Sequence, residues 1–394
     1  MSKVAPIDQR KADHIRISLE EDVDSALKTG LERYQFVHEA LPEIALADVD
    51  LGLSLFGKRL CAPILISSMT GGTEEAGEIN ARLAEAVQET GIAMGLGSQR
   101  AAIENPKQIS TFSIARKMAP DALLFANLGA IQLNYGYGID ECRRAVDMLE
   151  ADALILHLNP LQEAVQAGGD TNFAGLAKKI EAICAKLEVP VIAKEVGWGI
   201  SERTAKLLTD CGVDAIDVAG AGGTSWSQVE MHRAPDEFTK QLAATFVDWG
   251  ISTADSILNV KKTAPEMIVF ASGGLKNGLD IAKSIALGAT LGGMTRLFLE
   301  SAIVSTAKVV EAIELVKKQI EVAFFAAGIA TMNEIVGVGL RPTPTHPSLT
   351  HTDSPLPHHF RSHPKKRHQN QRGAKYQLQI GQHKNARHRN HYPK

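Results

Sequence analysis

The feature that most constrains the fold is a regular alternation of short apolar runs with longer amphipathic segments. Eight runs of strand length follow one another, at residues 63–67, 92–96, 123–126, 153–156, 191–194, 215–218, 268–271 and 289–294. Helix-like segments lie between them, including 79–89, 142–149, 176–187, 201–210 and 279–286, and residues 301–327 supply a last helix. Near-continuous apolar strands that alternate with helices indicate a parallel sheet covered on both faces.

Eight such units predict an α/β fold, the closed (β/α)8 or TIM barrel, as a single domain. The runner-up is an open doubly wound sheet. Its nucleotide-binding form needs a Gly-x-Gly-x-x-Gly turn after the first strand, and this chain has none there. With 394 residues, 44% of them hydrophobic, the chain can build a large core. We expect the barrel domain at 1–340 and a separate tail at 341–394.

The composition changes abruptly at the start of this tail. Residues 341–394 hold 11 of the 42 Lys and Arg residues and one acid, Asp353, so their net charge is +10, against −13 for the first 340 residues. So polar a segment cannot bury enough apolar surface to offset its ordering entropy, and we expect a disordered tail. It is either a basic arm for nucleic acid or a segment unrelated to the fold. We favour the second, because its basic residues are not interleaved with aromatic ones.

The chain as a whole suggests a cytoplasmic protein. Its net charge of −3 gives no reason to expect a nucleic-acid partner for the barrel. The four cysteines lie far apart without a Cys-x-x-Cys pair, which argues for a reducing compartment and against a zinc site or disulfides. The longest apolar run, 322–330, is too short to cross a membrane, and the first ten residues lack a signal-peptide core.

The carboxyl ends of barrel strands carry the chemistry, and the richest of them is residues 157–163. His157, Asn159, Gln162 and Glu163 follow the apolar run 153–156. They offer proton donors, proton acceptors and a metal-binding carboxylate. Glu163 could bind Mg2+, or it could be a helix-start carboxylate stabilised by the helix dipole.

Glycine pairs follow the last two strands, at 273–274 and 292–293. Glycine lets backbone N–H groups approach phosphate oxygens, and a following helix N-terminus adds a favourable dipole. Thr224, in the glycine-rich stretch after the sixth strand, can add a hydroxyl donor. Two such pairs favour a phosphate site over simple tight turns.

Lys194 closes an apolar strand, where a lysine is costly unless it meets an anion or an electron-rich ring. It could be a flavin partner, a Schiff-base lysine, or one half of an ion pair with Glu195 or Asp217. Residues 67–70 could enclose the other side of a planar ring.

Two groups of cations could bind a second phosphate. Arg100 follows Ser98 and Gln99 at the second strand end, and Arg10 and Lys11 lie near the N-terminus. Arginine makes bidentate contacts that suit a diphosphate. Spacing alone favours a solvated charge pair for Arg10 and Lys11.

Taken together, the chain from residue 8 to about 335 resembles the type 2 isopentenyl-diphosphate isomerases, which are FMN-dependent barrel enzymes. Seven motifs in the order of that family carry the resemblance: Arg10-Lys11-x-Asp13-His14, Ser68-Met69-Thr70-Gly71-Gly72, Gly97-Ser98-Gln99-Arg100, His157-Leu158-Asn159-Pro160-Leu161-Gln162-Glu163, Lys194-Glu195-Val196-Gly197, Gly222-Gly223-Thr224-Ser225-Trp226 and Ser272-Gly273-Gly274.

The resemblance implies a role for each matching residue. Those expected to contact FMN are Ser67, Ser68, Met69, Thr70, Ser98, Asn127, Lys194 and Thr224, with Gly273, Gly274, Thr295 and Arg296 at its phosphate. Those expected to bind the substrate are Arg10, Lys11, Ser98, Gln99, Arg100 and Gln162. Glu163 is expected to be the Mg2+ ligand, and His157, Asn159, Gln162 and Lys194 to serve the chemistry.

The implied reaction converts isopentenyl to dimethylallyl diphosphate in isoprenoid biosynthesis, with reduced FMN taking part in proton transfer. NADPH or NADH would serve only to reduce the flavin. The expected assembly is a homo-oligomer, a tetramer or an octamer.

Two other functions remain open. An FMN-dependent 2-hydroxy-acid oxidase or dehydrogenase would need a His and an Arg near the seventh strand, and residues 254–257 carry neither. A non-catalytic FMN-binding protein, or a nucleic-acid-binding protein acting through the tail, is the other alternative.

Overall fold

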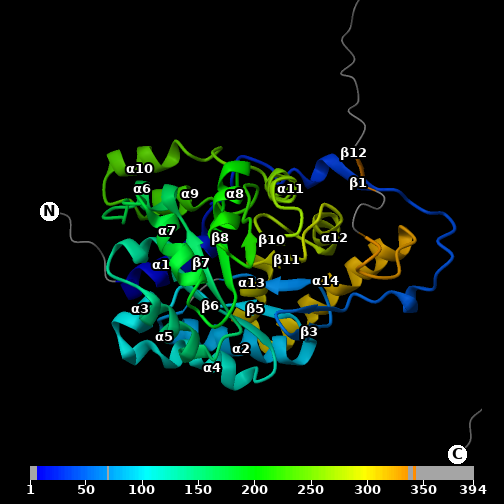
Figure 1. Cartoon of the computed structure of the whole chain (residues 1–394), viewed down its shortest axis with the longest axis horizontal. Coiled ribbons are helices and arrows are strands. Elements are labelled where there is room, and N and C mark those ends of the chain that lie inside the picture. Colours follow the sequence, from blue (N-terminus) through cyan, green and yellow to red (C-terminus); the bar gives the residue numbers. More distant parts are fainter. Residues whose placement is uncertain (1–6, 69–70, 336–339, 343–394) are drawn as a thin grey trace, which may run out of the picture. The chain divides into compact units, whose positions relative to one another are not determined.

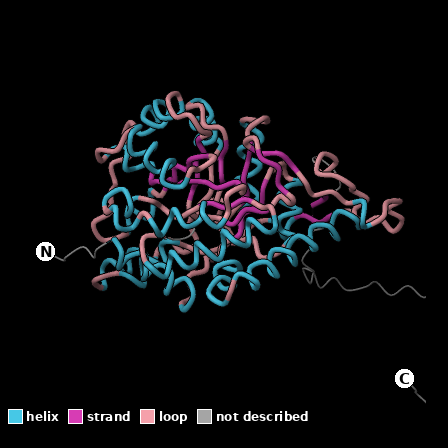
Figure 2. The backbone as a smooth tube through the Cα atoms, turned by 90° about the horizontal axis from the view of Figure 1, so that it is seen from below, coloured by secondary structure: helices cyan, strands magenta, loops and turns pink. Residues whose placement is uncertain are grey.

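A computed structural model describes residues 7–68, 71–335 and 340–342, with the side chains from Asp13 onward. Within them the chain forms a closed barrel of eight parallel strands with its helices outside (Figures 1 and 2), which confirms the predicted fold. All eight predicted runs form barrel strands: β4 (Ile64–Ile66), β5 (Ala93–Gly95), β6 (Leu123–Gly129), β7 (Ala153–Leu158), β8 (Val191–Glu195), β9 (Ala215–Asp217), β10 (Ile268–Ala271) and β11 (Leu291–Met294). The barrel closes because β11 pairs with β4 as well as with β10.

The helices begin and end at residues that suit those positions. In α2 (Glu74–Thr90), the Thr73 side chain caps the first turn by accepting from the Ala76 N–H, and Gly91 ends the helix in the left-handed region at φ 67°. The remaining helices are α3 (Arg100–Glu104), α4 (Ser110–Met118), α5 (Ile139–Leu149), α6 (Pro160–Val165), α7 (Leu176–Cys184), α8 (Glu202–Asp210), α9 (Trp226–Arg233), α10 (Glu237–Ala244), α11 (Thr253–Thr263), α12 (Gly278–Ala286), α13 (Arg296–Val304) and α14 (Thr306–Ala326), besides α1 (Ile7–Glu20).

Apolar side chains fill two separate layers. One layer lies between the strands and the helices, and the other lies inside the barrel, where Leu65, Phe125 and Phe270 are buried. The rings of Phe125 and Phe270 stack with centroids 5.9 Å apart, and Phe56 meets both edge-on. The barrel interior is therefore a packed core and not a pore.

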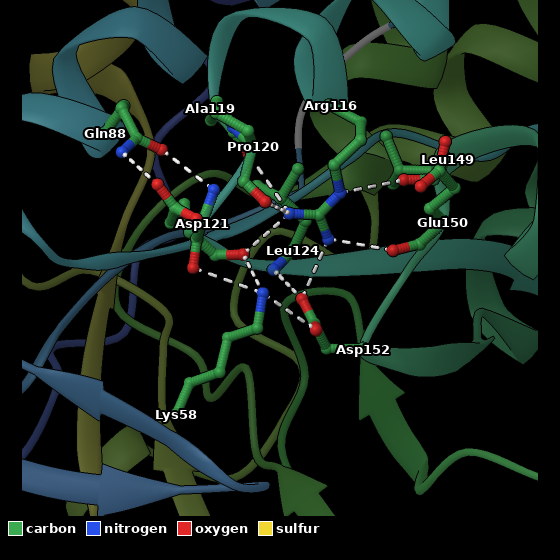
Figure 3. Close-up of polar contacts among 11 residues, drawn as sticks. Lys58, Gln88, Arg116, Ala119, Pro120, Asp121, Leu124, Leu149, Glu150 and Asp152 are labelled. Atoms are coloured by element: carbon green, nitrogen blue, oxygen red, sulfur yellow. Dashed lines mark hydrogen bonds and ion pairs between the residues drawn. The ribbon is translucent and has the colours of Figure 1, made fainter.

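A hairpin of β2 (Leu53–Leu55) and β3 (Lys58–Leu60) brings Phe56 to this core at the amino ends of the strands. Next to it, Lys58 Nζ lies 3.0 Å from Asp152 Oδ1, and Arg116 donates to Asp152 Oδ2 at 2.9 Å (Figure 3). Both cations also donate to backbone carbonyls, those of Asp121 and Ala122 among them. This network stabilises the end of the barrel that is remote from chemistry.

Two segments outside the barrel units bear on the predictions. Helix α1 packs against α9 and α13. Strand β1 (Tyr34–Phe36) pairs antiparallel with β12 (Leu340–Pro342), so Arg341 and Pro342, the first residues of the expected tail, form part of a strand. Residues 343–394 lie outside the described ones, and the tail's disorder and its boundary stay predictions. None of the helices in the described part of the chain is long and apolar enough to cross a membrane.

Candidate active site

A cavity of about 550 Å³ opens at the carboxyl ends of the barrel strands. Most of the predicted site residues line it together: Ser67, Ser68, Ser98, Arg100, Asn127, His157, Asn159, Gln162, Glu163, Lys194, Thr224, Gly273, Gly274, Thr295 and Arg296. All eight strand ends contribute to this set, and Arg296 adds the start of α13. Residues far apart in the chain thus share one enclosed space.

Of the other five predicted residues, Gln99 lies away from the cavity, and four have side chains outside the described part of the chain. Gln99 is fully buried away from the cavity, where its Nε2 donates to the Ala145 carbonyl at 2.8 Å and its Oε1 accepts from the Asn127 N–H at 2.9 Å. It therefore positions the strand end that carries Asn127. Arg10 and Lys11 belong to α1, but their side chains lie outside the described part, as do Met69 and Thr70 entirely.

Strand register places a row of polar residues side by side at the carboxyl ends of β7, β8 and β9. His157 pairs with Lys194 in the β7–β8 ladder, and Lys194 pairs with Asp217 in the β8–β9 ladder. Nδ1 of His157 lies 2.8 Å from Oδ1 of Asn127, so Nδ1 carries the hydrogen in this contact. A side chain at Gly129, the next residue of the row, would press on the imidazole at 3.2 Å.

Glu163 lies in the first turn of α6, which follows Asn159 and begins at Pro160. Its Oε1 accepts from Asn159 Nδ2 at 2.9 Å, and its Oε2 accepts from Gln166 Nε2 and from the Asp170 N–H. The carboxylate is buried with protein donors on both oxygens. Three donors among the described residues leave one acceptor position of the carboxylate unused, on Oε1, which takes a single hydrogen bond.

Glu230 of α9 positions Gln162 through a hydrogen bond. The sequence analysis did not identify Glu230. Gln162 Nε2 donates to Glu230 Oε1 at 3.0 Å, His14 Nε2 lies 3.3 Å from the same oxygen, and Arg233 Nη1 is 2.5 Å from Oε2. Burial alone would raise the pKa of Glu230. The hydrogen bond and charge of His14, together with Arg233, outweigh burial and lower the pKa to about 2. The only sequence signal was His14 in a motif near the N-terminus.

Arg100 is held by two acids. Its Nε is 2.8 Å from Glu104 Oε1, and its Nη1 is 3.1 Å from Asp170 Oδ2, which also accepts from Gln132. Burial works to lower the pKa of Arg100, but the hydrogen bonds and charges of Glu104 and Asp170 prevail and raise it. Asp170 thus connects this guanidinium to Glu163 through its backbone N–H.

Lys194 has two partners. Its Nζ donates to the Glu195 carbonyl at 2.7 Å and lies 3.7 Å from Asp217 Oδ2. Of the alternatives for Lys194, the ion pair with Asp217 is therefore present, and the residue also lines the cavity.

Glu195 is itself a buried acid at the end of β8. Its Oε2 accepts from three successive backbone N–H groups, those of Val196, Gly197 and Trp198, at 2.7, 2.6 and 2.5 Å. Burial raises the pKa of Glu195 to about 7, although the three N–H groups and Lys194 oppose that rise. The carboxylate fixes the turn that presents Val196 and Gly197 to the cavity.

The glycine loops after β9 and β10 pack backbone against backbone. Gly273 and Gly274 have φ of 99° and 75°, and a Cβ on Gly274 would lie 2.3 Å from the Gly222 carbonyl oxygen. A Cβ on Gly223 would lie 2.5 Å from the Gly274 nitrogen. Only glycine allows the two loops to pack this closely together at the cavity wall.

Two hydroxyls on the first strand end are buried without a partner. Among the described residues, Ser67 Oγ and Ser68 Oγ have no hydrogen-bond partner, and both residues line the cavity. A Cβ on Gly293 would approach Ser67 Oγ to 2.5 Å, and one on Gly95 would approach Ser68 Oγ to 2.7 Å. Buried polar atoms are rarely left unpaired, so these hydroxyls indicate a ligand with polar atoms at this wall.

One of the cations that line the cavity near the glycine loops, Arg296, is already paired. Arg296, the first residue of α13, has Nη1 3.2 Å from Asp24 Oδ1, and both residues line the cavity. Asp24 also bridges to Thr224, so this pair ties the N-terminal segment to the loop after β9.

Comparison with known proteins agrees with this geometry. Residues 148–341 match the family model of FMN-dependent dehydrogenases. The isopentenyl-diphosphate delta-isomerase of Nostoc sp. (strain PCC 7120) is 56% identical over 335 residues, covering 85% of this chain and 95% of that protein. The enzyme of the same name from Rickettsia bellii is 49% identical over 333 residues, covering 84% and 97%.

Among solved structures, a crystal structure of mandelate oxidase superimposes with a TM-score of 0.59 at 16% identity, covering 85% of this chain and 97% of that one. A mandelate oxidase variant with benzaldehyde gives 0.61 at 18%, covering 86% and 95%. At such identities the likeness concerns the fold alone. The sequence matches carry the assignment: the chain is an enzyme of the isopentenyl-diphosphate delta-isomerase family, built on the barrel of the FMN-dependent dehydrogenases.

Proposed function

We propose that the protein interconverts isopentenyl and dimethylallyl diphosphate, using FMN and Mg2+. One observation carries the proposal: a single cavity combines glycine loops suited to phosphate with the polar group of His157, Asn159, Gln162 and Glu163. A flavin phosphate and a substrate diphosphate need two separate anion sites, and the cavity offers candidates for both.

The wall formed by β4, β10 and β11 fits FMN. The unpaired hydroxyls of Ser67 and Ser68 can donate to polar atoms of the ring, and the N–H groups of Gly273 and Gly274 can bind its phosphate. Ser98, Asn127, Thr224, Thr295 and Arg296, with Met69 and Thr70, complete the proposed FMN contacts. Bound reduced FMN supplies the proton donor and acceptor that an isolated alkene requires.

The residues of the chain prepare the site for this proton transfer. Lys194 would favour the reduced, anionic ring. At ~4 Å and an effective dielectric of ~20 one such charge pair contributes about 4 kcal/mol. His157, fixed by Asn127, and the Asn159–Gln162 pair would line the alkene end.

Glu163 is the proposed Mg2+ ligand. One carboxylate with substrate phosphates and waters makes a normal magnesium site, because Mg2+ prefers oxygen ligands and retains water. Among the described residues no group of three or more His, Cys, Asp or Glu side chains could hold a metal, so a site shared with the substrate is the form that fits. Arg100, Ser98 and Gln162, with Arg10 and Lys11 of α1, are the proposed diphosphate contacts, with Gln99 in support.

Five further proposals accompany this function. NADPH or NADH would serve only to reduce the flavin, since the isomerisation is redox-neutral. The protein would act in the cytoplasm as a homo-oligomer. The domain would occupy residues 1–340, and residues 341–394 would form a disordered tail outside that fold.

The test is an anaerobic assay with chemically reduced FMN and Mg2+ that follows the allylic diphosphate. We expect turnover that stops on chelation of Mg2+ and on flavin removal. No turnover with flavin fully bound contradicts the proposal. Oxygen uptake with 2-hydroxy acids, measured on the same preparation, would instead support the oxidase alternative.

A further inference from the structure

An acid without a role in the proposed function lies directly behind Lys194. Asp217 ends β9 and is 0% exposed. It does not line the cavity, but it is the register partner of Lys194, which does. Its position is therefore set by the barrel itself and not by a loop.

The contacts of Asp217 orient its two oxygens differently. Oδ1 accepts from Ser272 Oγ at 2.6 Å and from the Ala219 N–H at 3.3 Å. Oδ2 has no hydrogen-bond partner among the described residues and lies 3.7 Å from Lys194 Nζ. Burying a carboxylate with one oxygen unbonded is costly, so the contact with the ammonium group compensates it.

No other described acid is within ion-pair distance of Lys194. Glu195 is adjacent in sequence, but its carboxylate is turned to the N–H groups of residues 196–198 and only its carbonyl accepts from Nζ. His157 lies on the opposite side of Lys194 in the ladder, with Nδ1 against Asn127. The charge that Lys194 presents to the cavity is thus opposed chiefly by Asp217.

We propose that Asp217 sets the reduction potential of the bound FMN by offsetting the charge of Lys194. Two-electron reduction with uptake of one proton leaves the flavin ring with one additional negative charge. An unopposed ammonium group would favour that reduced form, and a carboxylate paired with it reduces the preference because the two fields partly cancel. The proposal rests on FMN binding alone and not on the isomerase reaction.

The experiment measures the potential of the FMN-loaded protein by equilibrium with a reference dye. Asp217→Asn keeps the shape and can still accept from Ser272. At fixed ambient potential we expect at least about a tenfold higher ratio of reduced to oxidised flavin, a rise of about 30 mV for a two-electron couple. Lys194→Met should shift the ratio in the opposite direction, and the double variant should return toward the wild type. Ser272→Ala keeps both charges and should change the ratio less than about twofold.

A merely structural role of Asp217 does not predict shifts of opposite sign. An unchanged or lower potential in Asp217→Asn overturns the proposal. If Asp217→Asn fails to retain FMN, Asp217→Ser is measured in its place, and failure of both neutral variants to bind flavin also overturns it, since the acid would then stabilise the fold alone. Absence of isomerase turnover in the FMN-loaded wild type, together with the expected shifts in potential among the variants, would refute the proposed function and leave this inference intact.

Discussion

Glu230→Gln tests how much the buried acid behind Gln162 contributes to the folded protein. The Glu230 carboxylate accepts a hydrogen bond from Gln162 and forms ion-pair contacts with His14 and Arg233. Its exposed fraction is 2%. Its pKa falls from an ordinary 4.5 to about 2. A difference of about 2.5 units corresponds to about 3 kcal/mol of stability at neutral pH. Removing one partner from a buried ion pair costs ~3–5 kcal/mol, which agrees.

The sign of the pH dependence follows from the lowered pKa. The ionised acid stabilises the folded state above about pH 4.5, and that contribution is lost as the pH falls toward about 2. We therefore expect the free energy of unfolding of the wild type to exceed that of Glu230→Gln by about 3 kcal/mol at about pH 7. At about pH 3.5 the difference should be only about 2 kcal/mol.

Urea unfolding followed by tryptophan fluorescence at both pH values measures this difference. Glu237→Gln, an exposed acid on the neighbouring α10, is the matched control and should change stability by less than about 0.5 kcal/mol. A difference for Glu230→Gln that stays the same at both pH values, or that is below about 1 kcal/mol at neutral pH, refutes the reasoning.

Three further variants test other parts of the site. Glu163→Gln should raise the Mg2+ concentration for half-maximal activity roughly tenfold or more while FMN remains bound; simultaneous loss of flavin would argue against the metal role. Gly274→Ala should lose FMN, because the added Cβ would lie 2.3 Å from a carbonyl oxygen. The flavin-to-protein ratio after gel filtration measures this loss. Gly136→Ala is the control that should retain FMN, since Gly136 has a similar φ of 97° but nothing within 4 Å of the added Cβ. The pKa of Glu195, raised to about 7, makes the folded wild type less stable as the pH rises from about 4.5 to about 7 and the acid ionises. In Glu195→Gln this fall in stability should be smaller. An unaltered pH profile of melting temperature would contradict this.

The fold was predictable because its signal is local and repeated. Each barrel strand is a short apolar run, amphipathic segments alternate with these runs, and some of the helices carry a cap, as Thr73 and Gly91 show for α2. The site was predictable to the extent that polar side chains stand at strand ends. His157, Glu163 and Lys194 all interrupt or follow apolar runs, and the structure brings them to one cavity.

What could not be predicted depends on tertiary contacts between distant segments. Glu230 lies on a helix with no strand-end signal, and its importance arises only when α1 brings His14 against it. In the sequence, Gln99 is a polar residue at a strand end, like its neighbours Ser98 and Arg100. The backbone conformation at the start of α3 nevertheless directs its side chain into the core. Sequence spacing does not predict which of these neighbouring side chains points into the cavity and which into the core.

The pairing of β11 with β4 has a consequence for how the protein acquires its cofactor. The first and last barrel strands meet only after residue 294 has joined the fold, and only then does Gly293 lie against Ser67. A flavin that needs both walls cannot be captured by a nascent or partly assembled barrel. Quenching of FMN fluorescence during refolding would therefore time the closure of the ring, the most non-local step on the folding pathway and the one with the largest loop entropy to overcome.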